Sequence, residues 1–184
     1  MGSLFIVVVV IIGSANLITL NQMDQKAEAL YQQNVLSVME EVWHKEGERI
    51  DLVIFLNGIA IFTFELKCNT SGQNYEDAIR QYKFERDYKT RLLKFKAGCL
   101  AHFAMDLNEV YMCTNLKGKS SFFLPFNRGC GVGIHSGKGN PHNENGINVS
   151  YMWEDILKKD TVLYLIDKII FLQKETKKDP DTGK

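Results

Sequence analysis

The sequence predicts an α/β domain built around one mixed central β-sheet that is flanked by helices. Three alternating or apolar strands follow one another across residues 35–68. A segment with apolar side chains at three-and-four spacing comes next, and further short apolar segments follow it. Strands, then a helix, then more strands are typical of a sheet with helices packed on its faces.

The three-stranded meander is the most regular part of the pattern. Residues Val35 to His44 alternate in polarity, residues Arg49 to Leu56 are nearly all apolar, and residues Ile59 to Cys68 form the third strand. The first two strands are joined by a turn at Lys45–Glu48. Asn57-Gly58 joins the second and third, and Asn-Gly between apolar runs is a strong hairpin signal.

The rest of the chain adds helices and shorter strands. Residues Tyr75 to Arg91 are expected to form a helix, with Ala78, Ile79 and Tyr82 on one face. The segments expected after it are strands at 97–106 and 110–114, a short extended piece at 121–126, a loop at 129–146, and helices at 153–159 and 161–172.

A chain of 184 residues with 45% hydrophobic residues fits one folded domain. We divide it into an N-terminal segment (1–30), a main domain (31–173) and a charged tail (174–184) that is expected to be disordered. The apolar run Leu4 to Ile12 is shorter than the ~20 residues that span a bilayer and lacks a basic flank. We therefore expect a buried strand there, then a helix at Met23–Gln33, and no membrane attachment.

The net charge and the cysteine spacing argue against some classes of function. Lys plus Arg and Asp plus Glu both total 22, which argues against strong binding to nucleic acid by this chain alone, although a local basic face stays open. None of the 4 cysteines forms a CxxC pair or has zinc-site spacing with a histidine. We expect reduced thiols in a cytoplasmic protein.

Asp51, Glu65 and Lys67 are the residues that indicate chemistry. The two acids stand among apolar residues, where a lone carboxylate is costly unless it is paired or binds a metal ion. Glu65 and Lys67 are two residues apart, so they face the same side of a strand. Two carboxylates suit Mg²⁺, and the lysine could orient a water molecule or stabilise negative charge on a phosphate.

The hairpin geometry sets a condition on this site. A regular ladder beyond Asn57-Gly58 would pair Leu56 with Ile59 and place Asp51 opposite Phe64, so that Glu65 would face away. We therefore predict either an odd-length loop or a β-bulge between Asp51 and Glu65. The alternative interpretation is a structural salt bridge between Lys67 and one acid, because the D…ExK pattern is short and common.

The wider sequence resembles a known family. The run from Arg49 to Gly58 and the strand ending Glu65-Leu66-Lys67 are similar to the core of the PD-(D/E)xK nucleases, in the version found at the N-terminus of the R subunit of type I restriction enzymes. The resemblance covers roughly Leu30 to Leu172 and includes Gly72-Gln73, Ala78-Ile79-Arg80-Gln81-Tyr82, Arg86, Phe95-Lys96, residues 99–106, Val110-Tyr111-Met112, residues 122–127, Gly139-Asn140-Pro141, Asn145-Gly146 and residues 150–154.

The resemblance implies a domain that cuts double-stranded DNA with Mg²⁺, for which Mn²⁺ can substitute. It implies that Asp51, Glu65 and the backbone carbonyl of Leu66 bind the metal, and that Gln81 supports the site. Two positions depart from the pattern. Ile50 stands where the superfamily name has proline, and the fourth residue after Gln81 is Glu85, so the partner of Gln81 stays open.

The resemblance also implies a larger assembly. In the family the nuclease domain precedes a helicase-like, ATP-driven translocase and works with methylation and specificity subunits. No GxxxxGK[ST] motif occurs here, so ATP binding is expected only in a full-length protein. The alternative function is a catalytically silent DNA-binding or subunit-assembly module that keeps the nuclease fold.

For several other residues a purely structural role is the alternative to a functional one. Arg86 and Lys83 are the candidate DNA-binding residues, and the alternative is a solvated helix face. His102 is interpreted as a core histidine. Phe122, Phe123 and Phe126 are expected in the core rather than on a base-stacking surface.

Overall fold

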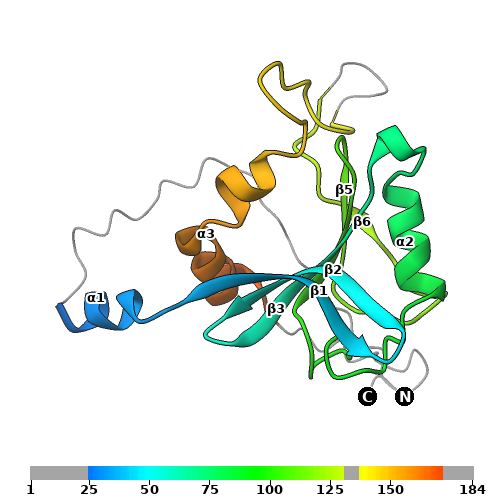
Figure 1. Ribbon diagram of the computed structural model, residues 1–184. Helices are drawn as coiled ribbons and strands as arrows, with labels where there is room; N and C mark the ends of the chain where they lie inside the picture. The colour runs from blue at the N-terminus through cyan, green and yellow to red at the C-terminus, as the bar shows by residue number, and fades with distance from the viewer. Residues whose placement is uncertain (1–24, 131–136, 172–184) are drawn as a thin grey trace, which may run out of the picture.

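The computed structural model describes residues 25–130 and 137–171 (Figure 1). The strand predicted at residues 4–12 and the tail predicted at 174–184 lie outside these ranges. The helix predicted at Met23–Gln33 is present as α1 (Gln25–Gln32). It is followed by a short connection to the first strand.

A six-stranded sheet forms the centre of the described structure, and its strands lie side by side in chain order. The strands are β1 (Leu36–Lys45), β2 (Glu48–Leu56), β3 (Ile59–Leu66), β4 (Ala101–Met105), β5 (Val110–Cys113) and β6 (Leu124–Pro125). Neighbouring strands are antiparallel except β3 and β4, which are parallel. The predicted mixed sheet is therefore confirmed.

The parallel step needs a crossover, and α2 (Tyr75–Phe84) supplies it. A one-turn 3₁₀ helix, η2 (Asn69–Ser71), leads from β3 toward α2. Asn74 caps α2 by accepting a hydrogen bond from the Glu76 N–H, and the Asp77 side chain accepts one from the Asn74 N–H. These two bonds fix where the helix begins.

The β2–β3 hairpin closes through the predicted two-residue turn. Asn57 and Gly58 both have positive φ, at 52° and 78°, and Leu56 pairs with Ile59. Left-handed conformations at both positions define the turn type whose twist matches a hairpin, and they explain why Asn and Gly are found there. The Asn57 side chain also accepts a hydrogen bond from the Val35 N–H.

Helices cover both faces of the sheet (Figure 1). On one face, Ala78 and Tyr82 of α2 pack with Val53 and Ala104 in a buried cluster. The other face is covered by C-terminal helices, which form a second cluster with Phe62, Phe64 and Phe103. These helices are η4 (Met152–Ile156), α3 (Lys159–Tyr164) and η5 (Leu165–Ile169), and η4 and η5 are π-helical.

Three predictions about elements need correction. The helix predicted to reach Arg91 ends at Phe84, because the segment after it docks on β1 and β2 instead of continuing the helix. The strand predicted from Ala97 begins at Ala101, since residues 94–98 form turns closed by the Lys94 carbonyl. Phe122 is 74% exposed, whereas Phe123 and Phe126 are buried as predicted.

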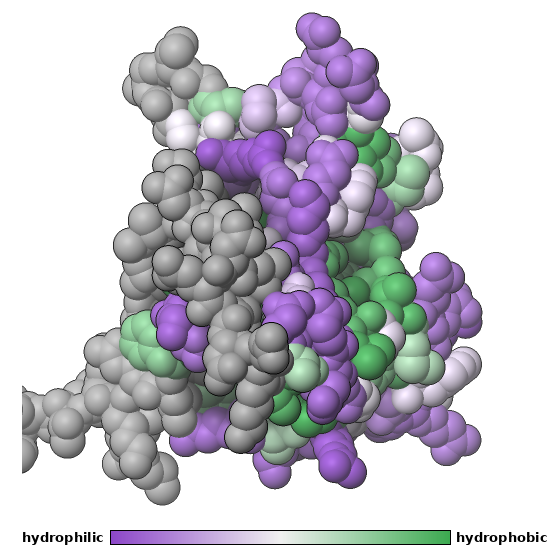
Figure 2. Space-filling view, turned by 90° about the vertical axis from the view of Figure 1, so that its left-hand side faces the viewer, coloured by the Kyte–Doolittle hydropathy of each residue, from purple (hydrophilic) through white to green (hydrophobic). Residues whose placement is uncertain are grey.

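Apolar residues also lie on the surface. Val38, Met39 and Trp43 of β1, an edge strand of the sheet, are all exposed. On the face that Figure 2 shows, apolar side chains gather in one area that is bordered by polar ones. In the described part of the chain, no helix has both the length and the apolar character needed to cross a membrane.

Candidate active site

A β-bulge in β3 brings the two predicted acids together. Phe55 pairs with Ala60, but Ile54 pairs with Phe62, so Ile61 is an extra residue in β3. Leu52 then pairs with Phe64, and the same register places Asp51 opposite Glu65. Residues that stand opposite each other on antiparallel strands point to the same face. Of the two predicted alternatives, the loop keeps its two residues and the bulge is the one present, and it puts both carboxylates on one side of the sheet.

Asp51 closes the end of the β2–β3 pair. Its Oδ2 accepts a hydrogen bond of 2.8 Å from the Leu66 N–H. The next backbone N–H, that of Lys67, donates instead to the Met105 carbonyl on β4, at 2.9 Å. Asp51 thus replaces a backbone partner where β3 leaves β2, and its half-buried side chain is fixed next to Glu65.

Glu65 is fully buried, at 0% exposure. Burial disfavours the charged carboxylate and raises its pKa to about 7; Arg86 opposes this shift and the neighbouring Asp51 adds to it. A carboxylate in such surroundings needs a positive partner to stay ionised. The structure provides one in Arg86.

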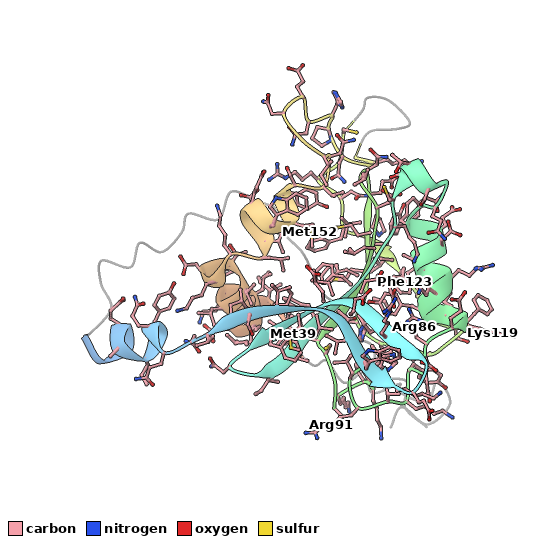
Figure 3. All side chains as sticks on the ribbon, viewed as in Figure 1. Met39, Arg86, Arg91, Lys119, Phe123 and Met152 are labelled. Atoms are coloured by element: carbon pink, nitrogen blue, oxygen red, sulfur yellow. The ribbon has the colours of Figure 1, made fainter. Side chains whose placement is uncertain are left out.

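Arg86 makes a two-pronged ion pair with Glu65. Its Nε donates to Oε1 at 2.7 Å and its Nη2 donates to Oε2 at 3.3 Å. The side chain of Arg86 is only 10% exposed. Figure 3 shows Arg86 between the β1–β2 hairpin and α2. Arg86 is predicted from the sequence to contact DNA, and its pairing with Glu65 is an additional finding of the structure.

The early end of α2 puts Arg86 in this place. Directly after the helix, the Asp87 N–H donates to Glu48 Oε2 at 2.8 Å, and Lys45 Nζ contacts the Asp87 carboxylate at 3.3 Å. His44 Nδ1 lies 3.0 Å from the Thr90 hydroxyl. These contacts attach residues 86–90 to the β1–β2 hairpin, so Arg86 turns inward rather than outward.

Lys67 follows Glu65 by two positions just beyond β3, and alternation puts it on the face of Asp51 and Glu65. Its side chain is half-buried. The predicted alternative, a salt bridge between Lys67 and one of the acids, is absent among the described residues, where Glu65 pairs with Arg86. Within the part of the chain that the structure describes, Lys67 thus has no ion-pair partner, although it lies on the same face as the two acids.

Gln81 and Lys83, both on α2, complete the predicted set. The Gln81 Oε1 atom is buried and has no hydrogen-bond donor in the described structure. An orphan oxygen of this kind is uncommon, since most buried polar atoms are paired. Lys83 is half-buried near Cys113, whose pKa is raised by burial and lowered slightly by that lysine. Contact of Lys83 or Arg86 with DNA stays a prediction.

A buried polar network behind Glu65 was missed in the sequence. The Thr63 hydroxyl lies 2.9 Å from the Tyr82 hydroxyl and 2.7 Å from His102 Nδ1. Burial lowers the pKa of His102 to about 3, so this histidine is neutral and belongs to the core, as predicted. Thr63 is two residues before Glu65, so the two side chains face the same side of the strand. This spacing is the sequence signal that could have revealed the network.

The donor set fits a hard divalent cation. Asp51 and Glu65 offer carboxylate oxygens, and Mg²⁺ binds one or two carboxylates together with water and substrate oxygens. Among the described residues no group of three His, Cys, Asp or Glu side chains could hold a metal ion. A site built on this pair would thus leave coordination positions for water and phosphate.

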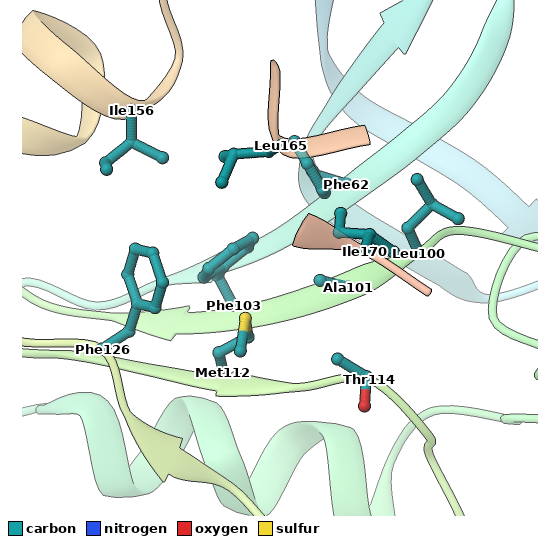
Figure 4. A pocket seen from close by; sticks show the side chains of 10 residues that line it. All are labelled: Phe62, Leu100, Ala101, Phe103, Met112, Thr114, Phe126, Ile156, Leu165 and Ile170. Carbon is teal, nitrogen blue, oxygen red and sulfur yellow. The ribbon is translucent and has the colours of Figure 1, made fainter. Parts of the chain in front are cut away.

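The apolar cavity on the other face of the sheet does not offer this chemistry. It measures about 30 Å³ and is lined by side chains such as Phe62, Phe103 and Leu165, with Thr114 as its one polar side chain (Figure 4). Cavities of this size hold at most a few water molecules. It is a packing defect between the sheet and the C-terminal helices.

Taken together, these features define a mixed α/β domain that presents two acids, a lysine and a buried arginine at one end of its β2–β3 hairpin. The family model described as type I restriction enzyme R protein N terminus matches residues 15–121, which is more than half of the chain. The chain belongs to this family, as the resemblance had indicated. Neither a curated protein nor a solved structure shows significant similarity to it.

Proposed function

We propose that this chain is the nuclease domain of a type I restriction enzyme R subunit and hydrolyses phosphodiester bonds of double-stranded DNA with Mg²⁺. The observation that carries the proposal is the bulge at Ile61. It turns a short, common sequence pattern into an acidic pair on one face of the sheet, and strand alternation puts Lys67 on the same face as Glu65. The family supports the proposal, because it is that of the N-terminal part of type I restriction enzyme R proteins.

The order of elements supports a PD-(D/E)xK assignment. The first acid lies on β2, Glu65 and Leu66 end β3 with Lys67 directly after it, and the candidate helper Gln81 lies on the crossover helix α2. β4 then runs parallel to β3. A hairpin followed by a crossover is a stable way to place residues from two strands and one helix around the same sheet end.

Each residue has a definite role in this proposal. Asp51, Glu65 and the Leu66 carbonyl would hold Mg²⁺, as the resemblance implies. When bound, the ion polarises the scissile phosphate and lowers the pKa of a bound water molecule. Lys67 donates hydrogen bonds to the attacking water or to the phosphate oxygens as their negative charge grows. Gln81 Oε1 can accept a hydrogen bond from the same water, since the described structure gives it no other donor.

We also infer that the domain works within a larger assembly. The equal numbers of basic and acidic residues make tight DNA binding by the chain alone unfavourable. An ATP-driven translocase domain and the methylation and specificity subunits would deliver the DNA. Cleavage by the chain alone is then expected to be weak and to require high enzyme concentration.

The test is plasmid cleavage by the purified chain, or by the whole complex, with Mg²⁺ or Mn²⁺ and with a chelator. Asp51→Asn and Lys67→Ala should abolish nicking, whereas Lys94→Ala, which changes an exposed lysine, should not. Full cleavage by Lys67→Ala would overturn the assignment. Chelation should stop the reaction in every active variant.

One observation favours the second candidate, a silent binding or assembly module. The Arg86 guanidinium contacts both oxygens of Glu65, so the carboxylate already has a cation. Titration calorimetry with Mn²⁺ separates the two functions. Binding that disappears in Asp51→Asn supports the nuclease, and no binding at millimolar concentration supports the silent module.

A further inference from the structure

We propose that Arg86 is a resident cation of this site, and that a divalent metal ion must displace it from Glu65 when it binds. The inference rests on the proposed function, since it presumes that Asp51 and Glu65 bind a metal. It adds a step that belongs to this chain's own residues. Arg86 would stabilise the metal-free protein and would be released when the metal enters.

The contact between Arg86 and Glu65 involves both oxygens of the carboxylate. Arg86 donates through two nitrogens to both oxygens of Glu65, at 2.7 and 3.3 Å. Glu65 is fully buried and the Arg86 side chain nearly so. Paired guanidinium and carboxylate groups with two contacts are among the stronger hydrogen-bonded ion pairs. A metal ion bound to either of these oxygens would stand next to the positive guanidinium, and repulsion between the two cations favours release of the arginine.

The balance of charge between the two acids and Arg86 also favours a resident cation. The bulge places Asp51 opposite Glu65, so two carboxylates share one end of the hairpin. Removing one partner of a buried ion pair is strongly destabilising, because the other charge is left uncompensated. Without Arg86 the metal-free protein would bury Glu65 beside another acid. Arg86 thus compensates the negative charge of Glu65, which the site needs only when it binds its metal ion.

The Arg86 side chain is also able to move away from Glu65. Within the described residues its guanidinium donates only to Glu65, while a guanidinium has five N–H groups. Arg86 also lies outside α2, in the segment that Glu48 and Lys45 hold through Asp87. That segment can stay docked while the side chain rotates. The released guanidinium would then lie beside the metal, where it suits a phosphate oxygen.

The direct test observes the arginine without any need for activity. In protein with ¹⁵N-labelled arginine, the Arg86 Nε–H signal is assigned by its absence from Arg86→Gln. Adding Mg²⁺ should shift or broaden this signal and speed its exchange with water. The signal should not respond in Asp51→Asn. A signal that stays unchanged in the wild type while the metal site is saturated would show that Arg86 keeps its place, and would overturn the inference.

The second test measures affinity for Mn²⁺ by titration calorimetry at alkaline pH, where protons compete little for Glu65. Arg86→Gln removes the competing charge, so it should bind Mn²⁺ tighter by roughly tenfold or more. The matched control is Arg80→Gln, which removes the same charge from an exposed arginine of α2 that pairs with Glu85 at 3.5 Å. Its affinity should stay within about twofold of the wild type, because exposed charges interact weakly.

The outcomes distinguish this inference from the proposed function. If neither the wild type nor Arg86→Gln binds Mn²⁺, both fail. If the wild type binds Mn²⁺ through Asp51 but Arg86→Gln binds with equal or lower affinity, the metal site stands and the exchange does not. Should Arg86→Gln fail to fold, Arg86→Lys takes its place, since it keeps the charge but loses the two-pronged contact and should also bind Mn²⁺ tighter.

Discussion

Asp51 and Glu65 stand opposite each other on β2 and β3 only because Ile61 is an extra residue in β3. The turn at Asn57-Gly58 would, by itself, start a ladder in which Glu65 faces the other side of the sheet. One residue of register therefore decides whether this hairpin holds a functional site. Each of the following predictions changes one contact that the site depends on.

Deletion of Ile61 should remove the bulge and leave the two acids together. Phe62 already pairs with Ile54, so in the variant it would follow Ala60 in a regular ladder and Asp51 would stay opposite Glu65. Loss of the buried Ile61 side chain should lower the free energy of unfolding by about 2–5 kcal/mol, measured by thermal unfolding in circular dichroism, while the affinity for Mn²⁺ should be kept. The control is Ile61→Val, which keeps the bulge and should cost only about 1 kcal/mol. A deletion variant that folds but no longer binds Mn²⁺ would contradict the register.

The contact between Glu48 and the Asp87 N–H should stabilise the segment that carries Arg86. Its 2.8 Å bond and the Lys45 ion pair are lost in Glu48→Ala, which should lower the free energy of unfolding by about 1–2 kcal/mol. Urea denaturation measures this. Glu46→Ala, in the adjacent turn, is the control and should be nearly neutral because Glu46 is exposed. Equal effects of the two changes would show that the docking contact contributes nothing.

The hydroxyl of Tyr82 should contribute measurably to stability. It is fully buried and lies 2.9 Å from the Thr63 hydroxyl. Tyr82→Phe should therefore cost about 1 kcal/mol, a typical value for one hydrogen bond, whereas Tyr88→Phe on a half-buried ring should cost less. Thermal or urea denaturation provides the comparison. A neutral Tyr82→Phe would mean that the network does not tie α2 to β3.

His102 should make the protein less stable in acid. Burial lowers its pKa from 6.5 to about 3, so between these values the unfolded chain binds more protons than the folded chain. Stability from this group is complete above pH 6.5 and is lost as the pH falls toward 3. The effect is on the order of a few kcal/mol. His102→Asn should flatten this part of the stability curve.

Glu65 changes the stability with pH in the opposite direction from His102, so the two contributions must be measured separately. Its folded pKa of about 7 exceeds the ordinary 4.5, so it stabilises the folded state below pH 4.5 and that contribution is lost as the pH rises through 7. Glu65→Gln should remove this loss. Unfolding measured across the range in both variants distinguishes the two groups, and a curve unaltered by either change would refute both assignments.

The amino-acid sequence determined much of the fold by itself. Alternating polarity, Asn57-Gly58 and the amphipathic start of α2 are local signals, and each acts within a few residues of chain. They predicted the meander, the crossover helix and the mixed sheet. The need for an odd-length loop or a bulge also followed from sequence, because alternation in a strand allows Asp51 and Glu65 to converge only if one residue is added.

Only the tertiary structure decided the partner of Glu65. No helix-breaking residue follows Phe84, so local propensity would continue α2 to Arg91, and the contacts of Asp87 and Thr90 with the β1–β2 hairpin end it instead. The same holds for the link from Thr63 to Tyr82 and His102, which joins residues far apart in the chain. Such pairings depend on burial and on which surfaces meet in the folded chain, and neither is encoded within a local window of sequence.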